Sequence, residues 1–102
     1  MRPATKDAVN QTLELDLQHG ILTIGRALDN DIVLDNPDVS EYHAKIVTYF
    51  HMALLIDLSS TTGSFLNGRH IIKHTIKEGD TITLGGEDIL IRNINPMLGK
   101  TA

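Results

Sequence analysis

The fold is decided at Ser64-Phe65-Leu66-Asn67-Gly68-Arg69-His70-Ile71-Ile72. Asn67-Gly68 is the strongest two-residue signal for a β-hairpin, because both central positions of a type I′ turn require a positive φ that Asn and Gly accept. The sequence therefore predicts a short strand on each side of this turn, at 64–66 and 69–72.

The residues on either side of this hairpin also follow the pattern of β-strands. Thr12-Leu13-Glu14-Leu15-Asp16-Leu17 alternates polar and apolar side chains, which places its leucines on one buried face. The apolar run at 53–58 predicts a strand buried on both faces. Many short strands joined by close turns are typical of a β-sandwich or a β-barrel. The remaining strands are predicted at 21–24, 32–34, 43–49, 81–84 and 89–94.

Length and composition limit the kind of protein. A chain of 102 residues forms one domain, and its apolar content is mostly aliphatic, so we expect a core of Ile, Leu and Val. Cysteine is absent, which excludes disulfides and thiolate metal sites. The five histidines show no spacing that supports a metal site, so neither a metal nor a cofactor is expected.

Charge and hydropathy exclude further classes. The formal net charge of −4 argues against a nucleic-acid-binding protein, which normally carries a basic surplus. The longest apolar run, Met52 to Ile56, is far too short to span a membrane, and residues 1–7 lack the apolar stretch of a signal peptide. We expect a soluble cytoplasmic protein, with one domain at 12–94 between flexible tails at 1–11 and 95–102.

Arg26 is the first residue whose chemistry suggests a function. It follows Gly25 directly after the predicted strand 21–24, and binding residues often lie where a strand leads into a loop. A guanidinium is always charged and presents a planar fork that clasps two phosphate oxygens. Taken alone, Arg26 is more simply interpreted as a solvated arginine beside Asp29 and Asp31.

A serine and a histidine follow at a spacing of three. Ser40 comes after a turn at 36–38, and its hydroxyl can donate to a second phosphate oxygen, although a serine in such a place most often caps the local backbone. His43 opens an apolar strand and Asp57 ends another. Because the sequence contains no G-x-S-x-G nucleophile elbow, a hydrolase built on His43 and Asp57 has little support.

Four motifs occur along the chain in a fixed order: Gly25-Arg26, Ser40-Glu41-Tyr42-His43, Ser60-Thr61-Thr62-Gly63-Ser64 and Asn67-Gly68. Their order and spacing resemble a forkhead-associated (FHA) domain, and the resemblance extends from Leu13 to Ile94. It implies an all-β fold, an FHA-like β-sandwich of two antiparallel-rich sheets with binding loops at one end. It also implies a module that binds phosphothreonine peptides in Ser/Thr kinase signalling and is not an enzyme.

The resemblance assigns roles by position. The residues expected to bind the phosphate are Arg26, Ser40 and Thr61. Peptide binding falls to Glu41, Thr62 and Asn67, of which Asn67 aligns with a position that hydrogen-bonds the peptide main chain. Structural roles fall to Gly25, His43, Gly63 and Gly68. Within this set, His43 is expected to be a buried, hydrogen-bonded brace for the binding loops, and Asp57 a structural acid at the end of its strand.

At two positions the sequence departs from the family pattern. Glu41 stands where many relatives carry a basic or an amide residue, and a carboxylate beside a phosphate is repulsive, although solvent and salt soften this at an exposed site. Thr62 stands where an asparagine is usual, so one contact with the peptide backbone is lost or remade by a hydroxyl. Both changes are expected to weaken binding, but neither removes the cation.

The expected partner is a protein that carries phosphothreonine, either a Ser/Thr kinase or its substrate, rather than a nucleic acid or a membrane, and the expected state is a monomer. The alternative is a phosphate-independent structural or dimerisation module, in which Glu41 marks a degenerate site. Exposed apolar residues on a strand would favour this alternative.

Overall fold

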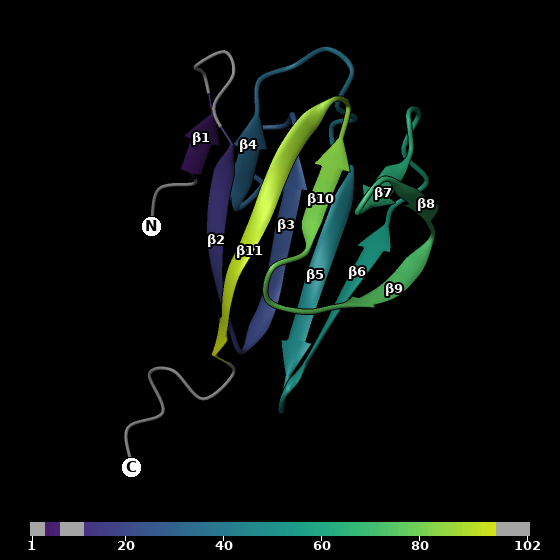
Figure 1. The fold of residues 1–102 in the computed structure, drawn as a ribbon. Helices are drawn as coiled ribbons and strands as arrows, with labels where there is room; N and C mark the ends of the chain where they lie inside the picture. Colours follow the sequence, from purple (N-terminus) through teal and green to yellow (C-terminus); the bar gives the residue numbers. More distant parts are fainter. Residues whose placement is uncertain (1–3, 7–11, 96–102) are drawn as a thin grey trace.

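The computed structural model of the chain describes residues 4–6 and 12–95, and all regular structure in this part is β-strand (Figure 1). The described residues include no helix long and apolar enough to cross a membrane. In chain order the strands are β1 (Ala4–Lys6), β2 (Leu13–Gln18), β3 (Gly20–Gly25), β4 (Ile32–Leu34), β5 (Ala44–Tyr49), β6 (Met52–Asp57), β7 (Ser64–Leu66), β8 (Arg69–Ile71), β9 (Lys73–Ile76), β10 (Thr81–Leu84) and β11 (Glu87–Asn95).

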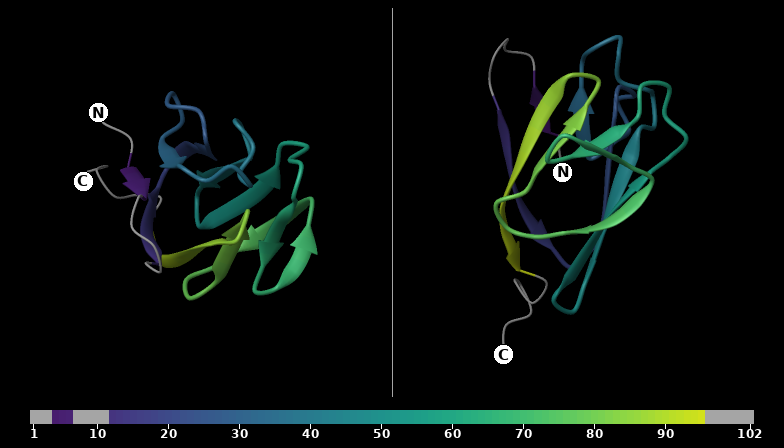
Figure 2. Two further views of the ribbon diagram at one scale, coloured as in Figure 1. Left: turned by 90° about the horizontal axis from the view of Figure 1, so that it is seen from above. Right: turned by 45° about the vertical axis from the view of Figure 1, so that its right-hand side comes forward.

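The strands form two sheets that pack face to face (Figures 1 and 2). The six-stranded sheet has the order β1-β4-β3-β5-β6-β9, and the five-stranded sheet has the order β2-β11-β10-β7-β8. Most neighbouring strands are antiparallel, whereas β4 runs parallel to β1 and β3, and β2 runs parallel to β11. The predicted all-β sandwich is therefore confirmed, with both sheets mixed.

The core lies between the sheets and is almost entirely aliphatic. Alternation along β2 buries Leu15 and Leu17, and Leu13 packs against the edge of the core, which confirms the predicted leucine face. From the opposite sheet, β5 buries Ala44 and Ile46. Since each buried Leu or Ile contributes about 1.5–3 kcal/mol, this layer fixes the strands that carry the loops at each end of the sandwich.

The predicted hairpin is present. Asn67 has φ 51° and Gly68 has φ 85°, and Leu66 pairs with Arg69 across the two-residue turn. Positive φ at both central positions is the geometry that selects this residue pair.

β6 differs from its prediction, because its outward side chains are not covered. Ala53 and Leu55 lie in the core, but Leu54 and Ile56 are only half-buried on the outer face, and Met52 is exposed. A continuous apolar run in this chain therefore marks a strand with one buried face and one open apolar face.

Two strands fall outside the predicted set. β9 has a single buried side chain, Ile76, so it shows no alternation, and β1 has only three residues. Both are edge strands that pair with a partner remote in sequence, β6 and β4 respectively. β1 lies within the segment expected to be a tail, and β11 reaches Asn95. The other parts of the expected tails, 1–3, 7–11 and 96–102, lie outside the described residues.

Candidate functional site

Four loops meet at one end of the sandwich, the upper end in Figure 1. They follow β3, β4, β6 and β10. Hydrogen bonds join them: Thr62 Oγ1 donates to the main-chain oxygen of Asp38 at 2.8 Å, and Asn36 Nδ2 donates to that of Gly85 at 3.3 Å. Most of the candidate residues from the sequence lie on these connected loops.

Arg26 is held at its base and free at its tip. Its main-chain nitrogen donates to the oxygen of Ser40 at 3.0 Å, and its Nε donates to the oxygen of Val39 at 3.0 Å. Within the described part of the chain, its two terminal nitrogens make no hydrogen bond and no carboxylate forms an ion pair with it. An exposed, oriented guanidinium with two unused nitrogens is suited to an anionic ligand.

The two carboxylates near Arg26 in sequence have other partners. Asp29 accepts the hydroxyl of Tyr42 at 2.9 and 3.0 Å, and this hydrogen bond raises the pKa of Tyr42. Asp31 accepts the main-chain nitrogen of Thr23 at 2.9 Å. Neither acid is therefore engaged with Arg26, whose solvated tip stays open to an anion.

Ser40 lies directly beside Arg26 and keeps its proton available. Its Oγ accepts the main-chain nitrogen of Thr61 at 3.0 Å. No described residue accepts a hydrogen bond from this hydroxyl, so its hydrogen can be donated to a ligand. Thr61 is exposed, and its main-chain nitrogen brings its loop to this hydroxyl.

His43 connects the loops from below. It is fully buried, its Nδ1 accepts the main-chain nitrogen of Ser40 at 3.0 Å, and its Nε2 lies 2.8 Å from the main-chain oxygen of Gly63. Because Nδ1 accepts an N–H, the proton of the neutral ring is on Nε2, which donates to Gly63. His43 thereby holds the loops after β4 and β6 at a fixed separation.

Two glycines allow the backbones to approach this closely. A Cβ at Gly25 would lie 2.2 Å from the main-chain oxygen of Glu41. Gly63 has φ 91°, and a Cβ there would lie 2.9 Å from the ring of His70. Both positions require glycine for the contact that shapes the loops.

Asp57 organises the loop after β6. It accepts the hydroxyls of Ser60 at 2.5 Å and Ser64 at 2.6 Å and the main-chain nitrogen of Ser60 at 3.0 Å. Burial raises the pKa of Asp57, but these hydrogen bonds outweigh burial and hold the pKa below its ordinary value. Asp57 therefore stays ionised, as a structural acceptor.

The peptide-binding candidates separate into two groups. Glu41 lies at the loop end with an exposed carboxylate that no described residue binds, while its main-chain oxygen accepts Asn30 Nδ2 at 2.8 Å. Thr62 is on the same loops, but its hydroxyl is committed to Asp38. Asn67 lies beyond β7: its Oδ1 accepts Thr81 N at 2.9 Å, and its Nδ2 donates to Asp80 Oδ1 at 3.0 Å.

Two asparagines that the sequence did not single out hold the loops together. Asn30 is 2% exposed and donates to the main-chain oxygens of Ala27 and Glu41. Asn36 donates to Glu87 at 2.7 Å as well as to Gly85. The sequence shows Asn36 only as part of a turn, since its partners lie about fifty residues further along the chain.

Known proteins are similar to this chain in sequence and in fold. The family model for the FHA domain matches residues 22–85. The FHA domain-containing protein FhaA of Mycobacterium tuberculosis is 35% identical over 89 residues, which cover 79% of this chain and 17% of FhaA. The chain spans between 5% and 18% of the length of the curated relatives that it matches.

Two solved structures extend the comparison. The FhaA FHA domain complexed with the intracellular domain of Rv3910 has a TM-score of 0.69 and 34% identity, over 72% of this chain and 81% of that one. Mycobacterium tuberculosis EmbR in complex with a low affinity phosphopeptide has a TM-score of 0.66 and 36% identity, over 68% of this chain and 18% of that one.

Proposed function

Because this chain belongs to the FHA domain family, we propose that its loop end binds a phosphothreonine-containing segment of a partner protein. The observation that carries the proposal is the pair formed by Arg26 and Ser40. The guanidinium has two unused nitrogens, and the adjacent hydroxyl has an unused proton. A phosphothreonine brings a charge of about −1.5 to −2 and three acceptor oxygens, which match these donors.

We assign the roles as follows. Arg26 clasps two phosphate oxygens, Ser40 donates to the third, and the Thr61 hydroxyl assists. Glu41 and Thr62 lie along the path of the peptide, where Glu41 opposes acidic side chains of the partner. Asn67 is assigned to the hairpin and not to the peptide, since both ends of its amide are engaged within the domain.

The proposed module is a non-enzymatic adaptor. Both ring nitrogens of His43 are occupied by main-chain groups, and Asp57 is occupied by serines, so neither is placed to activate a nucleophile. Its partner would be a Ser/Thr kinase or a kinase substrate. We place it in the cytoplasm, where ATP-dependent kinases generate phosphothreonine.

A titration of phosphothreonine peptides tests the proposal. A degenerate peptide library, phosphorylated and unphosphorylated, is titrated against the wild type and Arg26→Ala. We expect the wild type to prefer phosphorylated peptides and Arg26→Ala to lose about 2–4 kcal/mol of binding free energy, as when a charge-assisted pair is broken. Lys73→Ala, which removes an exposed cation from β9, should bind as the wild type does. Equal affinity of the wild type for both libraries would refute the proposal.

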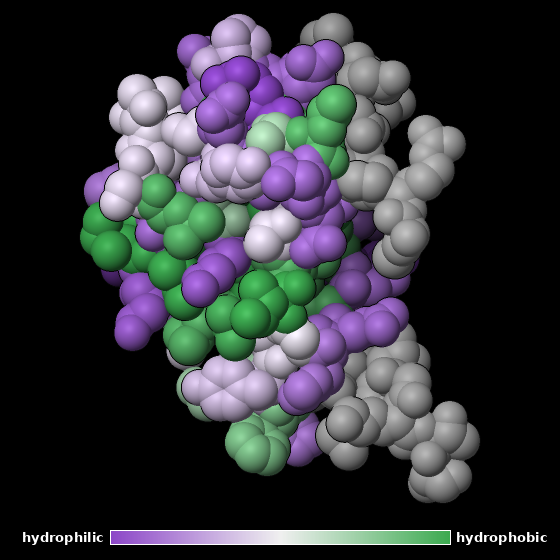
Figure 3. Space-filling model, turned by 180° about the vertical axis from the view of Figure 1, so that it is seen from behind, coloured by the Kyte–Doolittle hydropathy of each residue, from purple (hydrophilic) through white to green (hydrophobic). Residues whose placement is uncertain are grey.

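One observation favours a second candidate function, a phosphate-independent protein contact. The outer face of the six-stranded sheet exposes apolar side chains, including Ile21 at 62% and Met52 at 45% (Figure 3). Ile21 pairs with Val47, and Val47 pairs with Leu54, so the apolar row crosses three strands. If this face forms a dimer, light scattering will show a dimer that Ile21→Glu dissociates, with phosphopeptide binding unaffected.

A further inference from the structure

Positive charge is concentrated in one segment of this acidic chain. Residues 58–77 contain no Asp or Glu but contain Arg69, Lys73 and Lys77, together with His70 and His74, whereas the whole chain has a net charge of −4. A domain that repels anions overall attracts them only at a local positive surface. The segment 69–77 provides such a surface away from Arg26.

A groove opens where this segment crosses from one sheet to the other. β8 is the edge strand of the five-stranded sheet, and β9 is the edge strand of the six-stranded sheet. The groove between them has a volume of about 280 Å³. Its floor is apolar, formed by Leu66, Ile71 and Ile76. Its rim is polar and includes two cations, Arg69 and Lys77, and the imidazole of His74.

The polar side chains of the rim are available to a ligand. The side chain of Arg69 is exposed and makes no hydrogen bond or ion pair with any residue that the structure describes. The His74 Nδ1 lies 2.7 Å from the main-chain oxygen of Thr75, to which it donates, so Nε2 stays free for a ligand. Lys77 is 82% exposed and approaches Asp80 only at 3.5 Å.

Asp80 is the acidic residue among those that line the groove, and its carboxylate is already hydrogen-bonded within the domain. It accepts Asn67 Nδ2 at 3.0 Å and the main-chain nitrogen of Lys77 at 2.9 Å, and it is 6% exposed. Burial raises the pKa of Asp80, but the hydrogen bonds from Asn67 and Lys77 outweigh it and keep the pKa below its ordinary value. Its carboxylate supports the turn after β9, so the rim keeps a positive balance.

The groove adjoins the loop that carries Thr61. β7 begins directly after this loop, and its first residue, Ser64, pairs with Ile71 of the groove floor. The phosphate site and the groove are therefore connected through β7 and β8.

We propose that this groove is a second recognition site, which takes an acidic segment with an apolar side chain from the same partner that carries the phosphothreonine. Arg69 binds a carboxylate with its fork, Lys77 adds positive charge, and the apolar side chain covers the floor. The inference rests on the proposed function, because the phosphothreonine brings the segment to the groove.

Extended phosphopeptides test this second site. One phosphothreonine core is prepared with an extension of Asp, Glu and Leu, or with the same extension in Asn, Gln and Leu, on its N-terminal or its C-terminal side. Affinities are measured by fluorescence anisotropy. We expect that, for an extension on one of the two sides, the acidic peptide binds about tenfold tighter than the neutral one. Arg69→Gln should abolish this gain in affinity, whereas Lys73→Gln should keep it. Lys73 is the matched control because it lies on β9 but does not line the groove.

The outcomes separate the two proposals. If phosphorylation strengthens binding but acidic and neutral extensions bind equally on both sides, the groove proposal is refuted and the phosphate site stands. An equal loss in Lys73→Gln and Arg69→Gln would also refute it, because the effect would then be general charge. If phosphorylation of the core has no effect, the proposed function itself fails. Because Arg69 is exposed, its substitution should leave the melting temperature of the chain unchanged.

Discussion

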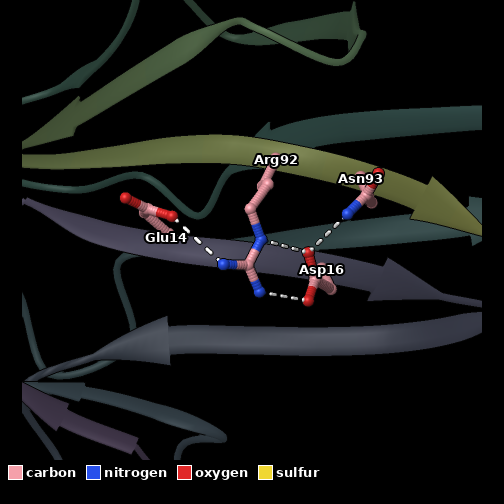
Figure 4. Close-up of polar contacts among 4 residues, drawn as sticks. All are labelled: Glu14, Asp16, Arg92 and Asn93. Carbon is pink, nitrogen blue, oxygen red and sulfur yellow. Dashed lines mark hydrogen bonds and ion pairs between the residues drawn. The ribbon is translucent and has the colours of Figure 1, made fainter.

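Arg26 and Arg92 place the same side chain in opposite situations. Arg92, on β11, uses its whole guanidinium: Nε and Nη2 donate to the two oxygens of Asp16 at 2.9 and 2.6 Å, and Nη1 donates to Glu14 at 3.2 Å (Figure 4). Arg26 uses only Nε, towards a main-chain oxygen. An arginine that is fully paired within the fold is not available to a ligand, so the comparison supports the proposed role of Arg26 in phosphate binding.

The two regions are also held together differently. Charged side chains on the exposed surface connect β2 and β11 around Arg92. Around Arg26 the loops are fixed mainly by hydrogen bonds between neutral groups, through His43, Asn30 and Ser40. The ionised Asp57 adds bonds from Ser60 and Ser64. A binding cation can stay unpaired because other residues supply the rigidity of its loops.

The largest expected effect comes from removing the buried brace. His43→Ala leaves the main-chain nitrogen of Ser40 and the oxygen of Gly63 without partners, and each such loss costs about 1–3 kcal/mol. We expect the free energy of unfolding to fall by about 2–4 kcal/mol, measured by chemical denaturation. Arg92→Ala, which removes only exposed pairs, should lose less. An equal loss in the two variants would contradict the distinction between the regions.

The next largest effect is expected on peptide affinity, when the two terminal nitrogens of the Arg26 guanidinium are removed. Arg26→Lys keeps the positive charge but cannot clasp two oxygens, so affinity for a phosphothreonine peptide should fall by about 1.5–3 kcal/mol. The matched variant Arg92→Lys should bind the peptide as tightly as the wild type. If Arg26→Lys also binds as tightly, only charge matters at this site, and the proposed two-oxygen contact is wrong.

A smaller effect, opposite in sign, is expected at Glu41. Its exposed carboxylate lies beside the proposed phosphate position, so Glu41→Gln should strengthen peptide binding by about 0.5–1 kcal/mol at low salt. Added salt should reduce this gain by screening. Glu14→Gln removes a carboxylate from the Arg92 cluster and should not change affinity. Weaker binding by Glu41→Gln would show that Glu41 contacts the peptide favourably.

The sequence predicts local features of this molecule better than contacts between distant segments. The Asn67-Gly68 turn and the leucine face of β2 depend on neighbouring residues, and both are present. β1 and β9 depend on pairing with remote strands, which no local pattern shows. The same limit hides the outer apolar face, because the run in β6 does not show what covers it.

The candidate binding site shows the same difference between local features and contacts of distant segments. The order of motifs along the chain brings Arg26, Ser40 and Thr61 to one end of the sandwich. Whether a polar side chain faces a ligand or a neighbour is decided by what lies opposite it in space. Thr62 meets Asp38, and Asn67 meets the turn after β9. In the sequence, Arg92 looks as free to bind an anion as Arg26 does, because its partner Asp16 lies 76 residues away from it.

The smallest expected effect uses acid to separate the two arginine regions. Hydrogen bonds from Arg92 and Asn93 lower the pKa of Asp16 from 3.8 to about 2. A carboxyl whose pKa is lower in the folded state stabilises the fold above its unfolded pKa, and this stabilisation is lost as the pH falls from about 4 to 2. Asp16→Asn should therefore show a shallower loss of unfolding free energy over this range than the wild type, in denaturation curves at pH 4, 3 and 2. Arg26→Ala should follow the wild-type slope, because Arg26 has no carboxylate partner among the described residues. If the unfolding free energies of the wild type and Asp16→Asn change with pH in parallel, the Arg92 cluster contributes nothing to stability. The pairing of Arg92 with Asp16 would then serve only to keep this arginine from binding anions.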